Sequence, residues 1–468
     1  MRNTKRELPL FSMYDHTGME RHLEEMAVQG WVLEKTTGFG WVYRRCEARR
    51  VRYAVTYFPK ASAYEPGPSE DKQIFQDYCA QAGWELVSDA AQMQIFRTEA
   101  KNPLPIETDA AIQVDNIHRA MKRSFLPSHF ALMAVSLLWA GLLGWRLITD
   151  PIGLLSSNSN LFTAFCWTIV LALSLLEVGG YFLWHRRAKA AAMRDGSFTP
   201  TRSHRRLQAV MLVVVLMALV VWLLASALDS GRTLALALAG LLHVMILVAL
   251  VNLLTRFLKR RKVSARTNRT VTLVSAVVLS SLSLVLMGYG IFRMIDHGWF
   301  GEHQGADTYT FHGLTWDVYR DPLPLTVEDL IDIDASDSYS YEWRDDSSVL
   351  LANLEATQHA RLDVPEPIPE LDYQIILVKL PLFYSLCRDS FLSRAARHND
   401  QMPPEYWDEY RLTDFPAWDA QSVYQLYRAG EPCDRYLVCW PDRILQIDFN
   451  WTPTAKQAAL AAEKLRAI

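Results

Sequence analysis

Residues 207–228 read LQAVMLVVVLMALVVWLLASAL, a stretch without one charged side chain. A helix of about 20 apolar residues is long enough to cross the hydrocarbon core of a bilayer. Four further stretches of similar length and character lie at 130–148, 161–184, 233–255 and 270–292. The pattern predicts a multi-pass α-helical membrane protein whose five spans occupy the region 127–296.

The loops between these stretches differ in positive charge, and the difference predicts their sides. Seven Lys and Arg residues stand in the second loop and seven in the fourth, whereas the first and third loops together hold only Arg232. The positive-inside rule places the basic loops in the cytoplasm. Arg119, Lys122 and Arg123 precede the first span and place the N-terminus inside as well. Five crossings of the plasma membrane then leave the C-terminus outside.

The charge of the two ends supports this division. Residues 297–468 contain 29 Asp and Glu against 14 Lys and Arg, a net charge of −15, and the rest of the chain carries +12. Basic side chains near an anionic inner leaflet each contribute about 1 kcal/mol to membrane attraction. Because the basic clusters lack interleaved aromatic residues, we expect no nucleic-acid binding. The predicted contacts with inner-leaflet lipid are Arg186, Arg187, Lys189, Arg205, Arg206, Lys259, Arg260, Arg261 and Lys262.

The N-terminal region 1–105 contains an internal repeat that predicts its fold. Thr17-Gly18-Met19-Glu20 has the form of a capping box, and the helix that follows closes at Gly30-Trp31-Val32-Leu33. A second helix, with Ser69 as its cap, closes at Gly83-Trp84-Glu85-Leu86. Its predicted apolar face consists of Ile74, Phe75, Tyr78 and Cys79.

Strands are expected after each of these glycine stops, at 39–45, 51–58 and 93–98. The repeat therefore predicts a cytoplasmic α+β domain, with one small antiparallel sheet and two helices on one face. Trp31 and Trp84 follow the stops at equivalent positions. Core packing is the favoured interpretation of both, and stacking on a flat ligand is the alternative.

The run from Phe11 to Pro59 resembles the bacterial domain of unknown function numbered 2812. The resemblance implies a cytoplasmic domain ahead of several membrane helices, and it brings no activity, cofactor or catalytic residue. It covers about the first quarter of the chain. The residues that carry it are Asp15, Glu20, Leu23, Met26-Ala27, Gly30-Trp31-Val32-Leu33 and the strand Tyr53 to Tyr57, with Gly83-Trp84-Glu85-Leu86 in its second half.

A linker helix is expected at 106–126, between this domain and the first span. Ala110, Val114, Ile117 and Met121 recur on one face of it, and Pro127 breaks the pattern. The helix is either a passive spacer, which is favoured, or an element that transmits motion.

Three polar residues inside the apolar stretches are candidates for function, since polar groups at bilayer depth are costly. They are Glu177, His243 and Asn252. His243 and Asn252 are nine residues apart, about 900° along a helix, and therefore point to opposite faces. Glu177 with His243 is the one plausible pair, although hydrogen bonding between helices is the favoured role. Small residues also give the fifth span a packing surface, namely Ser275, Ser280, Ser281, Ser283, Gly288 and Gly290.

The C-terminal region 297–468 is predicted to be an extracytoplasmic α+β domain. Strands are expected at 308–312, 315–319, 374–379, 436–440 and 445–449. A final helix is marked by Thr452 as its cap, Pro453 at its first position and an alanine-rich run to Ala467.

No motif in this sequence supports a metal site or an enzyme. Asp332, Asp334, Ser336 and Asp337 resemble the start of a calcium loop, but the sixth position is not glycine and the twelfth is Trp343. His297 and His303 lack a carboxylate partner in a motif. Cys387, Cys433 and Cys439 allow at most one disulfide outside, and packing is the favoured role of the cysteines.

The architecture predicts a non-enzymatic membrane sensor or scaffold, without a cofactor, that links its two folded ends through a protein partner or a second copy. The alternative is a transport-accessory or ion-coupled component that uses Glu177 and His243.

Overall fold

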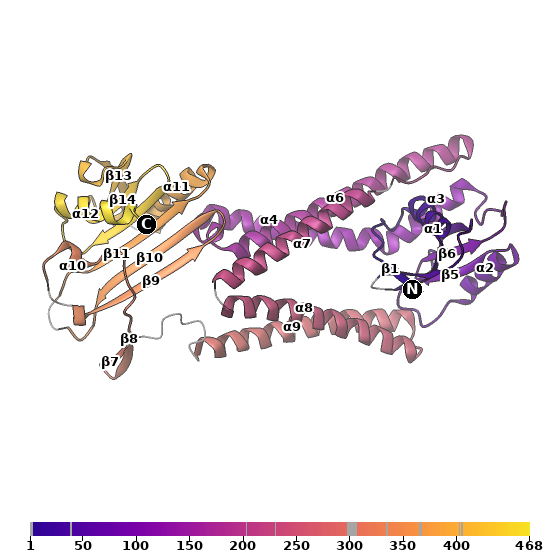
Figure 1. Cartoon of the computed structure of the whole chain (residues 1–468), viewed down its shortest axis with the longest axis horizontal. Coiled ribbons are helices and arrows are strands. Elements are labelled where there is room, and N and C mark those ends of the chain that lie inside the picture. The colour runs from indigo at the N-terminus through magenta and orange to yellow at the C-terminus, as the bar shows by residue number, and fades with distance from the viewer. Residues whose placement is uncertain are drawn as a thin grey trace. The chain divides into compact units, whose positions relative to one another are not determined.

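The computed structural model describes residues 3–37, 40–202, 204–229, 231–296, 307–333, 336–364, 367–401, 403 and 406–468. The chain divides into two compact units (Figure 1). The first unit contains Met1–Ala140 and Phe165–Tyr289, and the second contains Gly141–Ala164 and Gly290–Ile468.

The N-terminal module, residues 3–105, holds two three-stranded antiparallel sheets, so the prediction of one sheet is wrong. The Oγ1 atom of Thr36 and the Oγ atom of Ser88 lie 2.5 Å apart and link the two sheets. The first sheet has the order β1-β3-β2, with β1 at Thr4–Glu7, β2 at Trp31–Thr37 and β3 at Gly40–Arg45. The second has the order β4-β6-β5, with β4 at Arg52–Tyr57, β5 at Glu85–Ala90 and β6 at Met93–Thr98.

The two helices of the module end where the sequence predicts. Helix α1 covers His16–Val28 and helix α2 covers Glu70–Gln81. Gly30 and Gly83 follow them with φ angles of +81° and +85°, a left-handed conformation that glycine adopts without steric cost. A side chain at Gly30 would also lie 2.9 Å from the carbonyl oxygen of Cys46. The helix–glycine–tryptophan repeat is therefore a repeat of structure.

The start of α1 differs from the predicted capping box. Asp15 is the cap, and its carboxylate accepts a hydrogen bond of 3.1 Å from the backbone N–H of Gly18. The carboxylate of Glu20 instead accepts the N–H of Val55 at 2.8 Å. The Glu20 side chain, which the sequence pattern assigned to the helix start, therefore binds a buried backbone N–H of β4 instead.

The apolar face of α2 is narrower than predicted. Cys79 is buried and Phe75 is half-buried, but Ile74 and Tyr78 are 61% and 72% exposed. Trp84 closes the small cluster and donates its indole N–H to the carbonyl of Leu104 at 2.9 Å. The core interpretation thus holds for Trp84. Trp31 is half-buried, and the guanidinium of Arg45 lies 5.6 Å from its ring.

Five long apolar helices follow and match the five predicted spans in length and composition. The linker helix α3 at Ala110–Arg123 precedes them, capped by Asp109. Helix α6 has 38 residues and is about 57 Å long, nearly twice the thickness of a hydrocarbon core of about 30 Å. The five helices are α4 at Phe125–Thr149, α6 at Asn158–Asp195, α7 at Arg205–Asp229, α8 at Gly231–Arg260 and α9 at Ala265–Asp296.

The second unit is built on a seven-stranded antiparallel sheet of order β12-β13-β14-β15-β11-β10-β9. Alternate residues along a strand face opposite sides. On β11, Ile375 belongs to one hydrophobic core and Ile376 to another. The strands are β9 at Tyr339–Ser347, β10 at Leu351–Ala360, β11 at Leu371–Val378, β12 at Asp408–Thr413, β13 at Ser422–Arg428, β14 at Glu431–Cys439 and β15 at Arg443–Phe449.

Helices cover each core of this sheet. Helices α10, at Val327–Leu330, and α12, at Ala455–Arg466, pack with the first core. Helices α5, at Pro151–Leu155, and α11, at Tyr384–Ala395, pack with the second. The cap of α12 is Thr454, not Thr452 as predicted. A separate hairpin joins β7 at Asp307–Phe311 to β8 at Leu314–Val318.

Candidate functional site

The N-terminal module shares one hydrophobic core with the helices of its unit. Every residue of this core is less than a tenth exposed. Apolar residues recur along one stripe of the C-terminal half of α6, and this stripe is buried against the module and α3. The α6 residues are Val178, Tyr181, Trp184 and Ala188, those of α3 are Val114, Ile117 and Met121, and those of the module include Tyr14, Met19 and Leu23.

Tyr14 packs tightly against α6, and a glycine permits this approach. A Cβ atom at Gly180 would lie 2.8 Å from the hydroxyl oxygen of Tyr14 and 3.3 Å from Cε1 of His204. The neighbouring Gly179 has nothing of the described chain within 4 Å. The rings of Tyr14 and Tyr181 meet edge to face with centroids 5.5 Å apart. Gly180 is therefore a contact position, whereas Gly179 is not.

Polar contacts join the start of α1 to the basic loop between α6 and α7. The hydroxyl of Thr201 donates to the buried carboxylate of Asp15 and lies 2.5 Å from the hydroxyl of Thr17. The backbone N–H of Thr201 donates to the Thr17 hydroxyl at 2.9 Å. On α6, the indole N–H of Trp184 donates to the carbonyl of Thr199 at 3.2 Å. The Thr17 side chain thus serves the docking contact and does not cap its own helix.

Arg205, at the start of α7, binds the module. Its guanidinium donates to the Glu7 carboxylate at 2.7 Å and lies 5.2 Å from the ring of Phe11. The carboxylate of Glu7 also lies 3.1 Å from Nε2 of His22. Burial lowers the pKa of His22, and the nearby Glu7 carboxylate opposes that shift. Arg205 was predicted to contact lipid, but these contacts are with protein.

A further contact joins the module to α9. The buried side-chain amide of Asn268 donates to the carbonyl of Tyr64 at 2.9 Å. Thr272, one turn later, donates its hydroxyl to Asn268 at 3.2 Å. Sequence reasoning missed Asn268 because a single Asn in a basic loop carries no pattern of its own.

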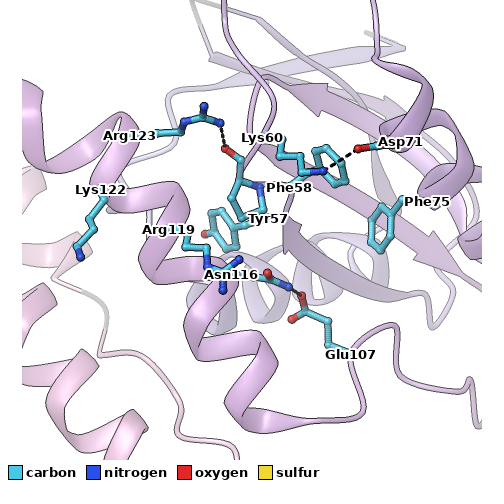
Figure 2. A pocket seen from close by; sticks show the side chains of 11 residues that line it. Tyr57, Phe58, Lys60, Asp71, Phe75, Glu107, Asn116, Arg119, Lys122 and Arg123 are labelled. Carbon is cyan, nitrogen blue, oxygen red and sulfur yellow. Dashed lines mark hydrogen bonds and ion pairs between the residues drawn. The ribbon is translucent and has the colours of Figure 1, made fainter.

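The linker helix α3 borders a cavity of about 660 Å³ on the module (Figure 2). Arg123 donates to the carbonyl of Pro59 at 2.8 Å, and Asn116 donates to Glu107 at 3.3 Å. Lys60 pairs with Asp71 across 2.8 Å. The hydrogen bond from Arg123 fastens α3 to the segment that follows β4.

A second cavity of about 660 Å³ contains the predicted candidate Glu177. Gln208 on α7 donates to Oε1 of Glu177 through a short hydrogen bond, and to the hydroxyl of Ser12 at 3.4 Å. Glu177 is only 8% exposed. In the described part of the chain, neither Oε2 of Glu177 nor Oε1 of Gln208 has a hydrogen-bond partner. Residue Glu177 therefore lies at the junction of module and helices, with acceptor capacity to spare.

The other two intramembrane candidates have partners of their own. Nε2 of His243 lies 2.5 Å from the hydroxyl of Ser283 on α9. The side chain of Asn252 donates to the carbonyl of Val248 on its own helix at 2.8 Å. The structure thus gives Glu177 and His243 different partners, Gln208 and Ser283, and joins helices α8 and α9 through His243.

Most of the other predicted lipid contacts are exposed. Lys189 lines a small cavity with His118 and His185, whose rings stack with centroids 4.0 Å apart. Lys259 is half-buried. The exposed ones are Arg186, Arg187, Lys189, Arg206, Arg260, Arg261 and Lys262.

The C-terminal candidates do not assemble a site among the described residues. The Asp337 carboxylate is fully exposed and lies 3.9 Å from Arg320. Asp334, His297 and His303 lie outside the described residues. All six cysteines are free, with Cys387 and Cys439 buried in the sheet domain. No group of three metal-ligating side chains occurs in the described ranges.

The module and its linker helix are the part of the chain with a known relative. Residues 15–128 match the family described as "Protein of unknown function (DUF2812)". The match begins at the α1 cap and ends just inside α4, so it includes the docking helix α3. Searches of curated proteins and of solved structures gave no match.

Proposed function

We propose that this protein is a non-enzymatic membrane sensor or scaffold, in which the N-terminal module docks on the membrane helices and its docking is linked to protein contacts on either side of the plasma membrane. The observation that carries the proposal is the shared core of Tyr14 with Val178, Tyr181 and Trp184. A module fastened in this way responds when those helices move. Its partner is a second protein or a second copy of the chain.

The proposed orientation is N-terminus inside and C-terminus outside. The basic loops at 186–206 and 256–269 both contact the module, through Thr201 and Asn268. The first loop, free of Lys and Arg, instead contacts the C-terminal domain, as in the bond from Ser348 to the Leu155 carbonyl at 2.5 Å. The contacts thus group the loops as the positive-inside rule does. The exposed basic residues would then meet anionic lipid.

Labelling with a membrane-impermeant thiol reagent tests this orientation. The native cysteines are removed, and each variant carries a single new cysteine at one of two exposed positions, Arg194 or Ala467. In intact cells we expect labelling at position 467 and none at 194 until the membrane is opened. The reverse pattern would overturn the orientation.

Two leucine substitutions, at Gly180 and at its neighbour Gly179, test the docking proposal. Gly180→Leu drives a side chain into Tyr14, whereas Gly179→Leu adds the same volume where nothing lies within 4 Å in the described chain. We expect amide exchange of α1 to be at least tenfold faster in the Gly180 variant and unchanged in the Gly179 variant. Proteins that copurify in mild detergent with the parent and the Gly179 variant should be lost from the Gly180 variant. Equal exchange and equal partners in all three would refute the proposal.

The rival function is an ion-coupled transport component. The cavity at Glu177 is the observation that favours it, because a carboxyl group in a cavity between spans can exchange protons. The separate partners of Glu177 and His243 count against a shared ion path.

A further inference from the structure

We propose that the cavity at Glu177 binds a single-chain primary amine, an amphiphile that places its ammonium group on Glu177 and its chain between the helices. This inference rests on the proposed sensor function and names its ligand class. The volume of about 660 Å³ lies in the range of small-molecule sites.

Much of the cavity lining is apolar and comes from three helices. The apolar lining comes from α4, α6 and α7, and it is suited to a hydrocarbon chain. The residues are Leu132, Val170, Leu173, Met211, Leu212 and Val215.

The polar part of the lining contains several hydrogen-bond acceptors. Oε2 of Glu177 and Oε1 of Gln208 lack partners in the described chain. The ring of His129 lies 2.9 Å, at Nδ1, from the carbonyl of Phe125, which can only accept. Nδ1 therefore carries a proton. The hydroxyl of Ser128 already donates to the same carbonyl at 2.8 Å.

These acceptors select among head groups. A primary ammonium group has three N–H donors and a positive charge, and it can bond to the Glu177 carboxylate through a charge-assisted hydrogen bond. A carboxylate or phosphate head group would bring further acceptors to a place that has them already. A trimethylammonium group has the charge but no N–H donor. The expected order of affinity is therefore amine, then trimethylammonium, then alcohol, with the carboxylate weakest.

The ligand would touch the module and the helices together. Phe11 and Ser12 of the module line the cavity along with residues of α4, α6 and α7. A compound that binds only when these elements are assembled stabilises the docked state by mass action. Amine binding should therefore slow amide exchange in α1.

The test uses the full chain in phosphatidylcholine nanodiscs with four probes of equal chain length: dodecylamine, dodecyltrimethylammonium, dodecanol and dodecanoate. Thermal unfolding is followed as each probe is titrated. We expect dodecylamine to raise the Tm saturably. Glu177→Gln should weaken dodecylamine binding at least tenfold. The control variant Glu25→Gln, which removes an exposed carboxylate on α1, should bind dodecylamine as the parent does. Leu212→Trp, which adds volume at an apolar lining position, should weaken dodecylamine binding by a similar factor.

Three results would overturn the inference. The four probes could act equally, or the Glu177 variant could respond like the parent; either result means partition into the bilayer only. Phosphatidylethanolamine in the nanodisc could raise the Tm with no further rise on adding the amine, which would assign the cavity to a lipid head group. Failure of this inference can be distinguished from failure of the sensor proposal, because the Gly180→Leu variant is measured without any probe.

Discussion

The module junction and the α5 junction both join a folded domain to a membrane-helix loop, but they are built differently. The module junction is the contact of Tyr14, Asp15 and Thr17 with α6 and the loop that follows it. The α5 junction is the insertion of Pro151–Leu155 into the C-terminal sheet domain. Ile152 and Leu155 are 1% and 4% exposed there.

The two junctions differ in how their polar atoms are hydrogen-bonded. At the α5 junction, Asn158 bonds both to the Ser347 carbonyl and to the N–H of Val349, and Arg397 donates to the carbonyl of Thr149. At the module junction, Asp15 Oδ2, Glu177 Oε2 and His204 Nδ1 have no hydrogen-bond partner in the described chain. Each buried unpaired group costs about 1 to 3 kcal/mol. The module junction should therefore open at lower free energy than the α5 junction.

A large effect is expected from the α5 junction. Ile152→Ala removes a buried side chain from the second core of the sheet domain, and it should lower the free energy of unfolding by about 2 to 5 kcal/mol. Denaturant unfolding of the purified chain, followed by amide exchange in β11, measures this loss. Exchange in α1 serves as the control and should not change. A loss below 1 kcal/mol would mean that α5 only rests on the domain.

The next effect separates module stability from module docking. Trp84 belongs to a small cluster with Cys79 and Phe96, apart from the core that reaches α6. Trp84→Ala should cost about 3 to 5 kcal/mol, whereas Trp31→Ala, at a half-buried position, should cost less than half as much. Thermal melting of the full chain gives both values. Equal losses would show that Trp31 contributes as much to the stability of the module as the buried Trp84.

Sequence periodicity predicted the membrane helices and the glycine stops because these signals are local. A run of 22 apolar residues or a left-handed glycine needs no partner to be recognised. Strand β10, with the sequence LANLEATQHA, consists largely of helix formers and was missed, because its pairing with β9 and β11 overrides its propensity. The other strands that were missed are β1, β2, β5, β9, β12 and β13.

The candidate site was predicted in part for the same reason. Glu177 was found because a carboxyl group in an apolar stretch is conspicuous. Its partner Gln208, the Tyr14–Gly180 contact and the role of Thr201 depend on residues 31 to 186 positions apart in the chain. Such contacts leave no period in the sequence, so the sequence pattern predicts a helix cap for Thr17 and a lipid contact for Arg205.

A smaller effect is expected from pH. Burial raises the pKa of Glu20 to about 7, and the hydrogen bond from Val55 opposes that shift. Since the folded state then holds a proton that the unfolded state releases above its ordinary pKa, stability is full at pH 4 and falls as the pH rises through 7. Glu20→Gln removes this loss and keeps an oxygen for the Val55 N–H.

The variant should be about 1 to 3 kcal/mol more stable than the parent at pH 8 and equal to it at pH 4. Burial lowers the pKa of His16, which destabilises both proteins equally as the pH falls below about 6.5. That contribution cancels in the difference between them. Melting curves at pH 4, 6 and 8 decide the matter, and a difference that does not change with pH would contradict the assignment.

The smallest effect is expected on ion flux, and it separates the sensor from its rival. Glu177→Gln keeps the side-chain shape and an acceptor for the Gln208 amide, so folding and docking should survive. A transport step that protonates and deprotonates this residue could not survive the same change. Proton and cation flux are compared for parent and variant in reconstituted vesicles with equal insertion. We expect no flux above empty vesicles in either. Flux in the parent that vanishes in the variant would make Glu177 part of an ion path, and the unpaired oxygen at the module junction would then mark a proton-transfer group and not the head-group site of an amine.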